Sequence, residues 1–498
     1  MQGHTLQVNK RLLMAVMVVG AFIAILNETL LNIALPQIMH DMTISASTAQ
    51  WLTTAYMLTN GVLIPVSAFL IQRFSTRKLF ISAVGIFAAG TLIAAMSPDF
   101  AVLLIGRVVQ ASGAAIMLPL LMNVVLTIYE PHQRGSAMGM IGMVITFAPA
   151  IGPTLSGWLV EHHSWRLLFF IVLPIALLDL LFAVKSLQNV MPLSKPKVSV
   201  LSVLLSTVGF GGLLYGFSSA GTAGWGSPTV ITSLVVALVA LTVFVVYQLR
   251  LQAPMLEFRV FGYPMFSLTT GIMILMMMAM FSSMLLLPIY LQTMRGFTSL
   301  QSGLLVLPGA VLMGIMSPIT GRIFDKIGAK LLAVVGALVT AGAMFGLAHI
   351  TLHTSFVYMA VLYALVMFGM SVMMMPTMTA GLNQLPQHLN PHGTAMSNTM
   401  QQVAGAIGTA LLVTVMTSET KAHLATQMRA LGTSTPSQVQ VAFAVRHASV
   451  LGMNDAFLVA GLISVAAFVL AWFIQRTGAH HAVFTEFEPE DLVAGDAP

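Results

Sequence analysis

The chain has 498 residues, of which 57% are hydrophobic and only 7% are charged, and its mean hydropathy is +0.92. Water-soluble domains carry roughly 25% charged residues, so this composition excludes a soluble globular protein. The net charge of +6 is spread over short segments, which excludes the basic patch of a nucleic-acid-binding protein, and the absence of cysteine excludes disulfides and cysteine-based metal sites.

Long apolar runs predict that the chain crosses a membrane repeatedly. A hydrocarbon core of about 30 Å requires roughly 20 apolar residues in a helix. The first run is too long for a cleavable signal peptide, so we expect it to stay as a membrane segment. By this measure fourteen spans are expected, over 12–35, 50–71, 79–96, 101–128, 136–160, 165–184, 200–219, 230–247, 265–291, 302–322, 331–350, 355–380, 393–417 and 455–475.

The distribution of basic residues predicts the orientation of these spans. An even number of spans places both termini on one side of the membrane. Of the 21 Lys and Arg residues, fifteen fall in segments on the side of the termini, five on the opposite side, and Arg107 within a span. Because cytoplasmic loops are enriched in Lys and Arg, we expect both termini in the cytoplasm.

Two basic turns divide the predicted spans into halves. Residues 73–78 follow the second span and 321–330 the tenth, which are equivalent places if spans 1–6 and 9–14 are parallel repeats. We therefore expect an N-terminal six-helix bundle (1–190), an inserted two-helix hairpin with a cytoplasmic connector (191–262), a C-terminal six-helix bundle (263–478) and an acidic cytoplasmic tail (479–498). Residues 249–261 are expected to lie along the cytoplasmic interface, and 418–454 to form the one sizeable outer loop.

Three ionisable residues stand out within the predicted spans: Glu28, Arg107 and Asp179. An ionisable side chain at membrane depth is costly, so each is a candidate functional group. At about 1.5 Å per residue, Glu28 and Arg107 both lie roughly 10 Å below the outer surface and can meet if their spans are neighbours. Two alternatives are open: a structural ion pair, or a site in which Glu28 carries a proton and the permanently charged Arg107 tunes it. Asp179, near the cytoplasmic end of its span, is expected to snorkel or pair locally and is a secondary proton candidate.

The fifth span has an almost bare face. Ala148, Gly152 and Ser156 stand four residues apart, and small residues at this spacing allow neighbouring helices to approach closely. Pro149 and Pro153 remove backbone donors and allow a kink. The segment 142–157 is either ordinary small-residue packing or a tight, water-excluding seam between the two halves.

Methionine is unusually frequent, with 37 residues, and it clusters in spans 9 and 12. Its soft, flexible side chain recurs on adaptable binding surfaces, although it also fills gaps in ordinary cores. We expect a central substrate cavity lined by these clusters and by polar groups of several spans. The candidate lining residues are Asn27, Asn32, Tyr56, Asn123, Met273, Met277, Met280, Met284, Tyr290, Met370, Met374, Asn398 and Gln401.

Together these segments resemble the fourteen-spanner drug:proton antiporters of the major facilitator superfamily. Residues 26–36, 103–115 and 142–157 are similar to that family's first-, fourth- and fifth-helix motifs, and 165–166 and 393–402 match further family patterns. The resemblance implies an all-α membrane protein with the major facilitator fold, in which Arg107 takes part in proton coupling. It also implies that the fifth-helix antiporter motif consists of Gly142, Pro149, Gly152, Pro153 and Gly157.

Two departures from the family pattern shape the expected site. The family usually has an acid where this chain has Asn27, so we carry the proton role to the following Glu28. In the family, an acid in each of two equivalent loops holds a helix N-terminus of the opposite half when the cytoplasmic side is shut; here Gln72 replaces the first acid, and Asp325 is the second. We therefore expect a gate latched mainly through Asp325 and Arg134. The wider set of gate residues is Arg73, Arg77, Arg134, Gly321, Arg322, Asp325 and Gly328.

The expected function is proton-coupled efflux of lipophilic or cationic compounds by alternating access. We expect the protein to be a monomer and to lie in the plasma membrane, namely the bacterial inner membrane. An exporter of one metabolite, peptide, siderophore or lipid is the alternative, and a proton symporter for uptake is less favoured because of 142–157. No phosphate-binding loop, histidine-rich metal cluster or nucleophile elbow is found, so we expect no enzyme, no metal and no cofactor beyond the proton gradient. The expected partners are the lipid bilayer, protons and small substrates, without nucleic acid.

Overall fold

The computed structural model describes residues 10–191, 193, 199–430 and 437–475, apart from the side chains of a few residues within helices. In this part of the chain the long regular elements are all helices, and no strand is found. The helices are α1 (Lys10–Met42), α2 (Ala46–Arg73), α3 (Thr76–Ala95), α4 (Phe100–Ile128), α5 (Arg134–His162), α6 (Arg166–Ser186), α7 (Val200–Ala223), α8 (Pro228–Arg250), α9 (Pro264–Ile289), α10 (Ser299–Ile327), α11 (Ala329–Leu347), α12 (Phe356–Leu382), α13 (Asn390–Ala430) and α14 (Gln438–Ala471).

Thirteen of these helices are long and apolar enough to cross a membrane, as judged on the described residues. The remaining helix, α5, is not among the thirteen. The chain is therefore a multi-pass, all-α membrane protein. That all fourteen helices span the membrane, with both termini in the cytoplasm, stays a prediction. So do the domain boundaries, and the acidic tail 479–498 lies outside the described residues.

Polar side chains mark where several helices begin and end. The side chain of Asp99 accepts a hydrogen bond from the N–H of Val102 at the start of α4, and Thr298 and Gln301 form a reciprocal capping box at the start of α10. Gly328 follows α10 with φ of +79°, a conformation that favours glycine, and α11 begins at the next residue. Because the membrane core offers no water to the backbone, such caps belong at its borders.

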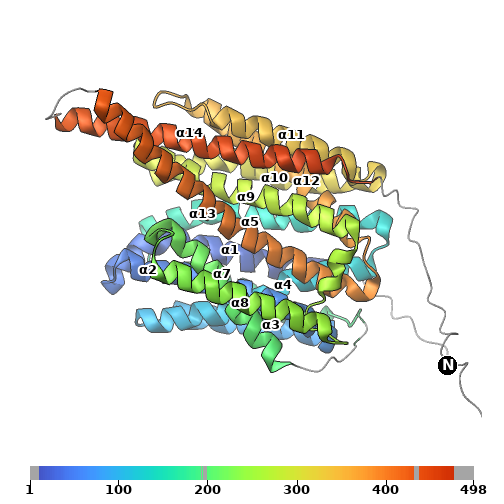
Figure 1. Cartoon of the computed structure of the whole chain (residues 1–498). Helices are drawn as coiled ribbons and strands as arrows, with labels where there is room; N and C mark the ends of the chain where they lie inside the picture. Colours follow the sequence, from blue (N-terminus) through green and yellow to red (C-terminus); the bar gives the residue numbers. More distant parts are fainter. Residues whose placement is uncertain (1–9, 192, 194–198, 431–436, 476–498) are drawn as a thin grey trace, which may run out of the picture.

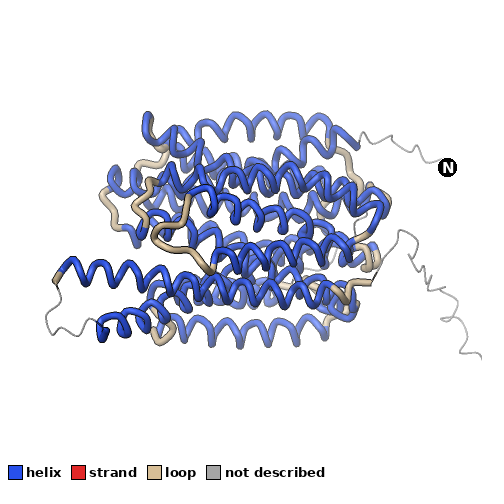
Figure 2. The backbone as a smooth tube through the Cα atoms, turned by 90° about the horizontal axis from the view of Figure 1, so that it is seen from above, coloured by secondary structure: helices blue, strands red, loops and turns tan. Residues whose placement is uncertain are grey.

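The helices form two groups that meet along α5 and α10. Helices α1 to α6 pack mainly on one another, as do α9 to α14, and the hairpin α7–α8 lies against α2 and α13. Figure 1 shows α13 running obliquely from the first group to the second. The first residue of α1 and the last of α14 lie at the same end of the bundle in both views, which we call the terminal end; the opposite end is the distal end (Figures 1 and 2).

The outer loop predicted over 418–454 is wrong. Helix α13 continues to Ala430 and α14 already begins at Gln438, where Ser437 and Gln440 form a capping box. Residues 418–430 are polar enough to end a predicted membrane span, but they contain no Gly or Pro and many good helix formers. The two helices therefore project beyond the rest of the bundle at the distal end (Figures 1 and 2).

The connector between α8 and α9, which the sequence predicts to lie along the cytoplasmic interface, packs one side into the helix bundle. Its regular part is a short 3₁₀ segment, Phe258–Gly262, and the side chains of Met255, Leu256 and Val260 are buried in the bundle. The Oε1 atom of Gln248 accepts a hydrogen bond of 2.8 Å from the N–H of Met255. These buried side chains and this hydrogen bond therefore fix the connector to the helix bundle.

Candidate functional site

Arg107 on α4 is the centre of a buried polar network. Its Nη1 atom donates hydrogen bonds of 2.7 Å to Oδ1 of Asn27 and 2.7 Å to Oε1 of Gln110, and the side chain is fully buried. Gln110 in turn donates a 2.8 Å bond to the hydroxyl of Thr91 on α3. The guanidinium carbon lies 4.1 Å from the centre of the Tyr56 ring on α2, a cation–π contact. Helices α1 to α4 therefore share in holding one positive charge.

One donor of this guanidinium is unused. The Nη2 atom of Arg107 is buried and has no hydrogen-bond partner among the described residues. Most buried polar groups are paired, because an unpaired donor loses its bonds to water without replacement. The site therefore has a buried, charged donor available for a further acceptor.

Helix α1 turns Asn27 and Glu28 in different directions, since one residue rotates a helix by about 100°. Asn27 is 2% exposed and contacts Arg107, whereas Glu28 is partly exposed. Among the described residues no ion pair joins Glu28 to Arg107, so the direct contact that the sequence suggests is made by Asn27 instead. Glu28 nevertheless lies within electrostatic range of Arg107 and Tyr56. Carboxylate and guanidinium share one site without touching.

Tyr56 and Asp179 are both buried. Tyr56, a candidate cavity residue, lies beneath Arg107, and its hydroxyl donates to the carbonyl of Ala24 at 3.3 Å. Asp179 neither snorkels nor pairs: it is 4% exposed, and its Oδ2 atom has no partner within the described chain. A side chain added at Gly20 of α1 would meet this Oδ2 atom, so Asp179 faces α1 from α6.

The network also contains residues that the sequence did not single out. Gln110 and Thr91 complete the shell around Arg107. Gln110 stands three residues after Arg107, which places both on one face of α4, and this spacing is the signal that finds it. Thr91 belongs to another helix, and its place depends on how α3 and α4 pack together.

The methionine-rich helices are mostly closed. Met273, Met277, Met370 and Met374 are buried, and Met280 is partly buried against the core. Met284 is 41% exposed, and its place in a substrate cavity stays a prediction. The clusters on α9 and α12 therefore fill the interior of the second group, apart from the distal end of α9.

The polar residues expected in the cavity separate into several places. Asn123 donates to the hydroxyl of Thr394 at 2.5 Å, and Asn398 approaches the sulfur of Met122 at 3.4 Å, so both join the two groups of helices. The remaining ones lie elsewhere: the hydroxyl of Tyr290 donates to the Thr351 carbonyl at the distal end, Gln401 contacts Met378 within the second group, and the side chain of Asn32 lies outside the described residues.

Helix α5 makes close contacts on two sides. Near its start, a side chain at Gly139 or Gly142 would collide with Ser317 of α10. Further along, a side chain at Gly152 would collide with Thr29 of α1, and the hydroxyl of Ser156 donates to the Leu30 carbonyl at 2.6 Å. The expected seam between the halves thus involves the first part of α5, while the later part packs within its own half.

The rest of the motif consists of one glycine and two prolines. Gly157 has open space around it, with nothing within 4 Å of an added side-chain carbon. Helix α5 continues without interruption through Pro149, which is partly buried, and through Pro153, whose side chain lies outside the described residues.

The terminal end is latched across the two groups by Asp325. Its two carboxylate oxygens accept hydrogen bonds of 2.8 and 2.9 Å from the N–H groups of Gly135 and Ser136, at the start of α5. A carboxylate at this position also meets the positive end of the helix dipole. Arg134 does not pair with Asp325; its Nη1 atom donates to Oδ1 of Asn383, at the end of α12, at 2.7 Å.

A second, uncharged latch lies on the pseudo-symmetric side. The Nε2 atoms of Gln72, on α2, and His392, on α13, are 2.6 Å apart, and the Nδ1 atom of His392 accepts a hydrogen bond of 3.2 Å from the N–H of Glu257 in the connector. Acceptance at Nδ1 leaves the proton of a neutral ring on Nε2, so Nε2 is a donor and the amide of Gln72 has to be turned to place its oxygen, in place of its nitrogen, opposite it.

The remaining gate candidates lie in different surroundings. Arg77 donates to the Val184 carbonyl at 2.6 Å within the first group, and Arg73 lies over the ring of Phe69 at 5.9 Å on its own helix. Arg322 is exposed. Gly321 packs directly on Gly135 between the groups, and Gly328 shapes the turn after α10.

Comparison with known proteins agrees with this architecture. The family description Major Facilitator Superfamily matches residues 17–409. The transporter YcnB of Bacillus subtilis, uncharacterised and of major-facilitator type, is 50% identical over 468 residues, 94% of this chain and 96% of that protein. The lincomycin resistance protein LmrB of Listeria monocytogenes is 46% identical over 464 residues, 93% of this chain and 96% of that protein.

A solved structure shows the same fold. The human organic anion transporter MFSD10 matches with a TM-score of 0.67, covering 93% of this chain and 100% of that chain, at 15% identity. With a family match over most of its length and relatives that are nearly half identical, this chain belongs to the major facilitator superfamily of membrane transporters.

Proposed function

We propose that the protein is a proton-coupled exporter of lipophilic, often cationic compounds, which works by alternating access in the bacterial cytoplasmic membrane. The observation that carries the proposal is the site around Arg107, where a buried guanidinium with an unused donor lies beside a carboxylate that it does not contact. The names of relatives support export, since one of nearly half identity is a lincomycin resistance protein.

In this proposal Asn27 and Glu28 have separate roles. Asn27 and Gln110 hold the guanidinium of Arg107 by hydrogen bonds that do not neutralise it. Glu28, without an ion pair, is the group that binds and releases the proton, and the persistent charge of Arg107 biases that equilibrium. A cationic substrate and a proton would then compete for one carboxylate. Asp179, a buried carboxyl group without a partner, is the secondary proton site.

The latched terminal end corresponds, in this proposal, to a closed cytoplasmic gate. The hydrogen bonds that join the two groups of helices among the described residues gather there, around Asp325, His392 and Thr394. Transport would require these bonds to break and re-form as the cavity turns from one side of the membrane to the other. The bilayer, protons and small substrates are the partners, and the transporter acts as a monomer without a cofactor.

The experiment is efflux of several chemically unrelated dyes from cells that express wild type, Glu28→Gln or Glu161→Gln, with and without a protonophore. Glu161 is an exposed acid near the distal end of α5 and serves as the matched control. We expect wild type and the control to extrude the dyes only with a proton gradient, and Glu28→Gln to lose gradient-driven efflux. Gradient-dependent efflux by Glu28→Gln would remove Glu28 from coupling, and export of a single compound from the panel would favour a specific exporter.

A further inference from the structure

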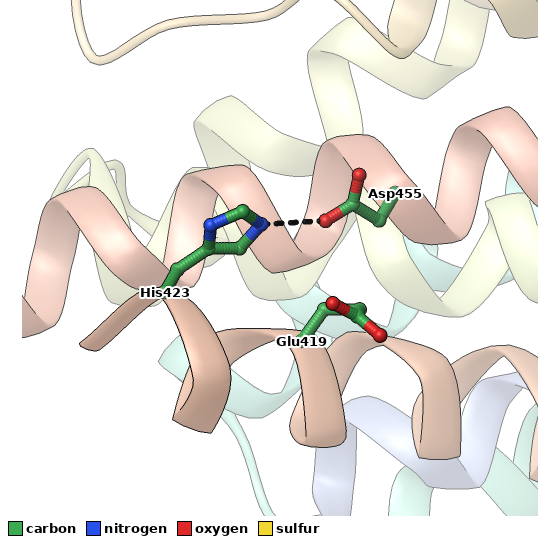
Figure 3. A group of neighbouring side chains, drawn as sticks. All are labelled: Glu419, His423 and Asp455. Carbon is green, nitrogen blue, oxygen red and sulfur yellow. Dashed lines mark hydrogen bonds and ion pairs between the residues drawn. The ribbon is translucent and has the colours of Figure 1, made fainter. Parts of the chain in front are cut away.

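Beyond the transport site, three side chains that can bind a metal meet at the distal end. Glu419 and His423 are four residues apart on α13, so they lie on one face of the helix, and Asp455 faces them from α14. Figure 3 shows the three side chains facing one another across the space between the two helices. This part of α13 belongs to the stretch that the sequence predicts to be an outer loop, and only its helical fold brings the three residues together.

The distances suit a single ion. One ligand atom of each residue lies within 4.8 Å of the others, and Nε2 of His423 is 2.8 Å from Oδ2 of Asp455. A tetrahedral Zn²⁺ site has bonds near 2.0–2.2 Å to nitrogen and oxygen, which places its donor atoms about 3.3 Å apart. The present separations, from 2.8 Å up to no more than 4.8 Å, lie on either side of that value.

The three side chains carry an excess of negative charge, which a bound cation would balance. Two carboxylates face one imidazole, and within the described chain no Lys or Arg forms an ion pair with Glu419 or Asp455. No hydrogen bond or ion pair of Glu419 is found among the described residues either. The side chains of His423 and Asp455 are 35% and 40% exposed, so an ion from the surrounding solution can reach them.

We propose that Glu419, His423 and Asp455 form a binding site for a divalent transition-metal cation such as Zn²⁺. The ligands are Nε2 of His423 and one oxygen of each carboxylate, and water completes the coordination. The cation takes the place of the proton between Nε2 of His423 and Asp455: a doubly protonated ring releases that proton to solvent, and a neutral ring carries its single proton on Nδ1 instead. The bound ion ties α13 to α14 at the point where both helices leave the bundle. This proposal departs from the expectation, drawn from the sequence, that the chain has no metal site.

A simpler role for the same residues makes a different prediction. If the His423–Asp455 hydrogen bond only clamps the two helices, Glu419 is dispensable and no stoichiometric metal binding occurs. Glu419→Gln separates the two cases, since it removes one charge and one ligand, keeps the shape, and breaks no hydrogen bond found in the described chain.

The experiment uses the full chain, purified in detergent through an affinity tag without histidine and stripped with a chelator. Zn²⁺ is titrated in competition with a chromophoric zinc chelator, and Co²⁺ absorption reports the coordination. His447→Gln is the matched control: it removes a histidine of the same hairpin, whose Nδ1 lies 2.6 Å from the amide nitrogen of Gln427 and near no carboxylate of this cluster. Size-exclusion profiles verify that each variant is folded.

We expect one Zn²⁺ per wild-type chain, affinity at least about tenfold weaker in Glu419→Gln, and no stoichiometric binding in His423→Gln. His447→Gln should bind as wild type does. Absence of stoichiometric binding to wild type at micromolar Zn²⁺, or equal affinity in Glu419→Gln and wild type, would overturn the three-ligand site.

Discussion

Oδ1 of Asn27 lies 2.7 Å from Nη1 of Arg107, while the neighbouring Glu28 makes no ion pair with that guanidinium in the described chain. The family resemblance expects an acid where Asn27 stands. An amide accepts the hydrogen bond but carries no charge, so Arg107 is held in position and keeps its full positive charge. In the proposed function, Asn27 therefore holds Arg107 and the adjacent Glu28 carries the proton.

This division predicts that Asn27 contributes more to the stability of the protein than Glu28 does. Asn27→Ala should destabilise the protein by about 1–3 kcal/mol, because it takes an acceptor from a buried, charged donor. Glu28→Gln should change stability by less than about 0.5 kcal/mol, since its carboxylate has no ion pair to lose. Thermal unfolding of the purified variants in detergent measures both. A larger loss in Glu28→Gln than in Asn27→Ala would contradict the assignment.

The Asp325 latch predicts how the terminal end responds to Asp325→Asn. An amide offers one oxygen where the carboxylate offers two to Gly135 and Ser136, and it loses the attraction to the helix dipole. Since hydrogen bonds to charged groups contribute about 1.5–3 kcal/mol, opening of this end should become at least tenfold more frequent.

The chain has no native cysteine, so a single Ala395→Cys in the buried start of α13 can report this opening. We expect faster modification by a maleimide reagent in Asp325→Asn than in the parent. Lys326→Gln, a change at the exposed neighbouring residue, is the control and should modify at the parent's rate. Equal rates in all three proteins would show that Asp325 does not hold the gate.

Two glycines of α5 should respond oppositely to alanine. In Gly139→Ala the new carbon would lie 2.6 Å from the backbone oxygen of Ser317, and backbone atoms of α10 cannot move aside easily. Overpacking of this kind costs about 1–3 kcal/mol. Gly157→Ala meets nothing within 4 Å and should be neutral or slightly stabilising, because alanine favours helix over glycine. Thermal unfolding and transport of the two variants test this; equal destabilisation would refute the α5–α10 contact.

The uncharged latch predicts a contrast between two nearby histidines. His392→Ala removes the contact to Gln72 and the acceptor of the buried N–H of Glu257, and should cost about 1–3 kcal/mol. His388→Ala, at an exposed position, should stay within about 0.5 kcal/mol of wild type. Unfolding midpoints in detergent give the comparison, and a harmless His392→Ala would mean that α2 and α13 are held by apolar contacts alone.

Several residues of the candidate site can be identified from single positions in the sequence, but the directions of their side chains cannot. Arg107 is identified by its charge within an apolar run, and Asp325 by its place in a basic turn. That Met284 is exposed and that Tyr56 lies beneath Arg107 cannot be read from the sequence. Depth along a helix follows from counting residues, but the direction in which a side chain points depends on the neighbours of that helix.

The sequence by itself determined that this is a repeatedly membrane-spanning helical protein. Apolar runs, and charged residues within them, can be recognised from the sequence alone, and a bilayer constrains both strongly. Helix packing decided the rest. It gave Arg107 to Asn27 rather than Glu28, since a rotation of about 100° separates the two. It also brought Asp455 to Glu419 and His423. Helix α13 continues beyond the end of its apolar part, and contacts between residues distant in sequence exist only once the helices are packed.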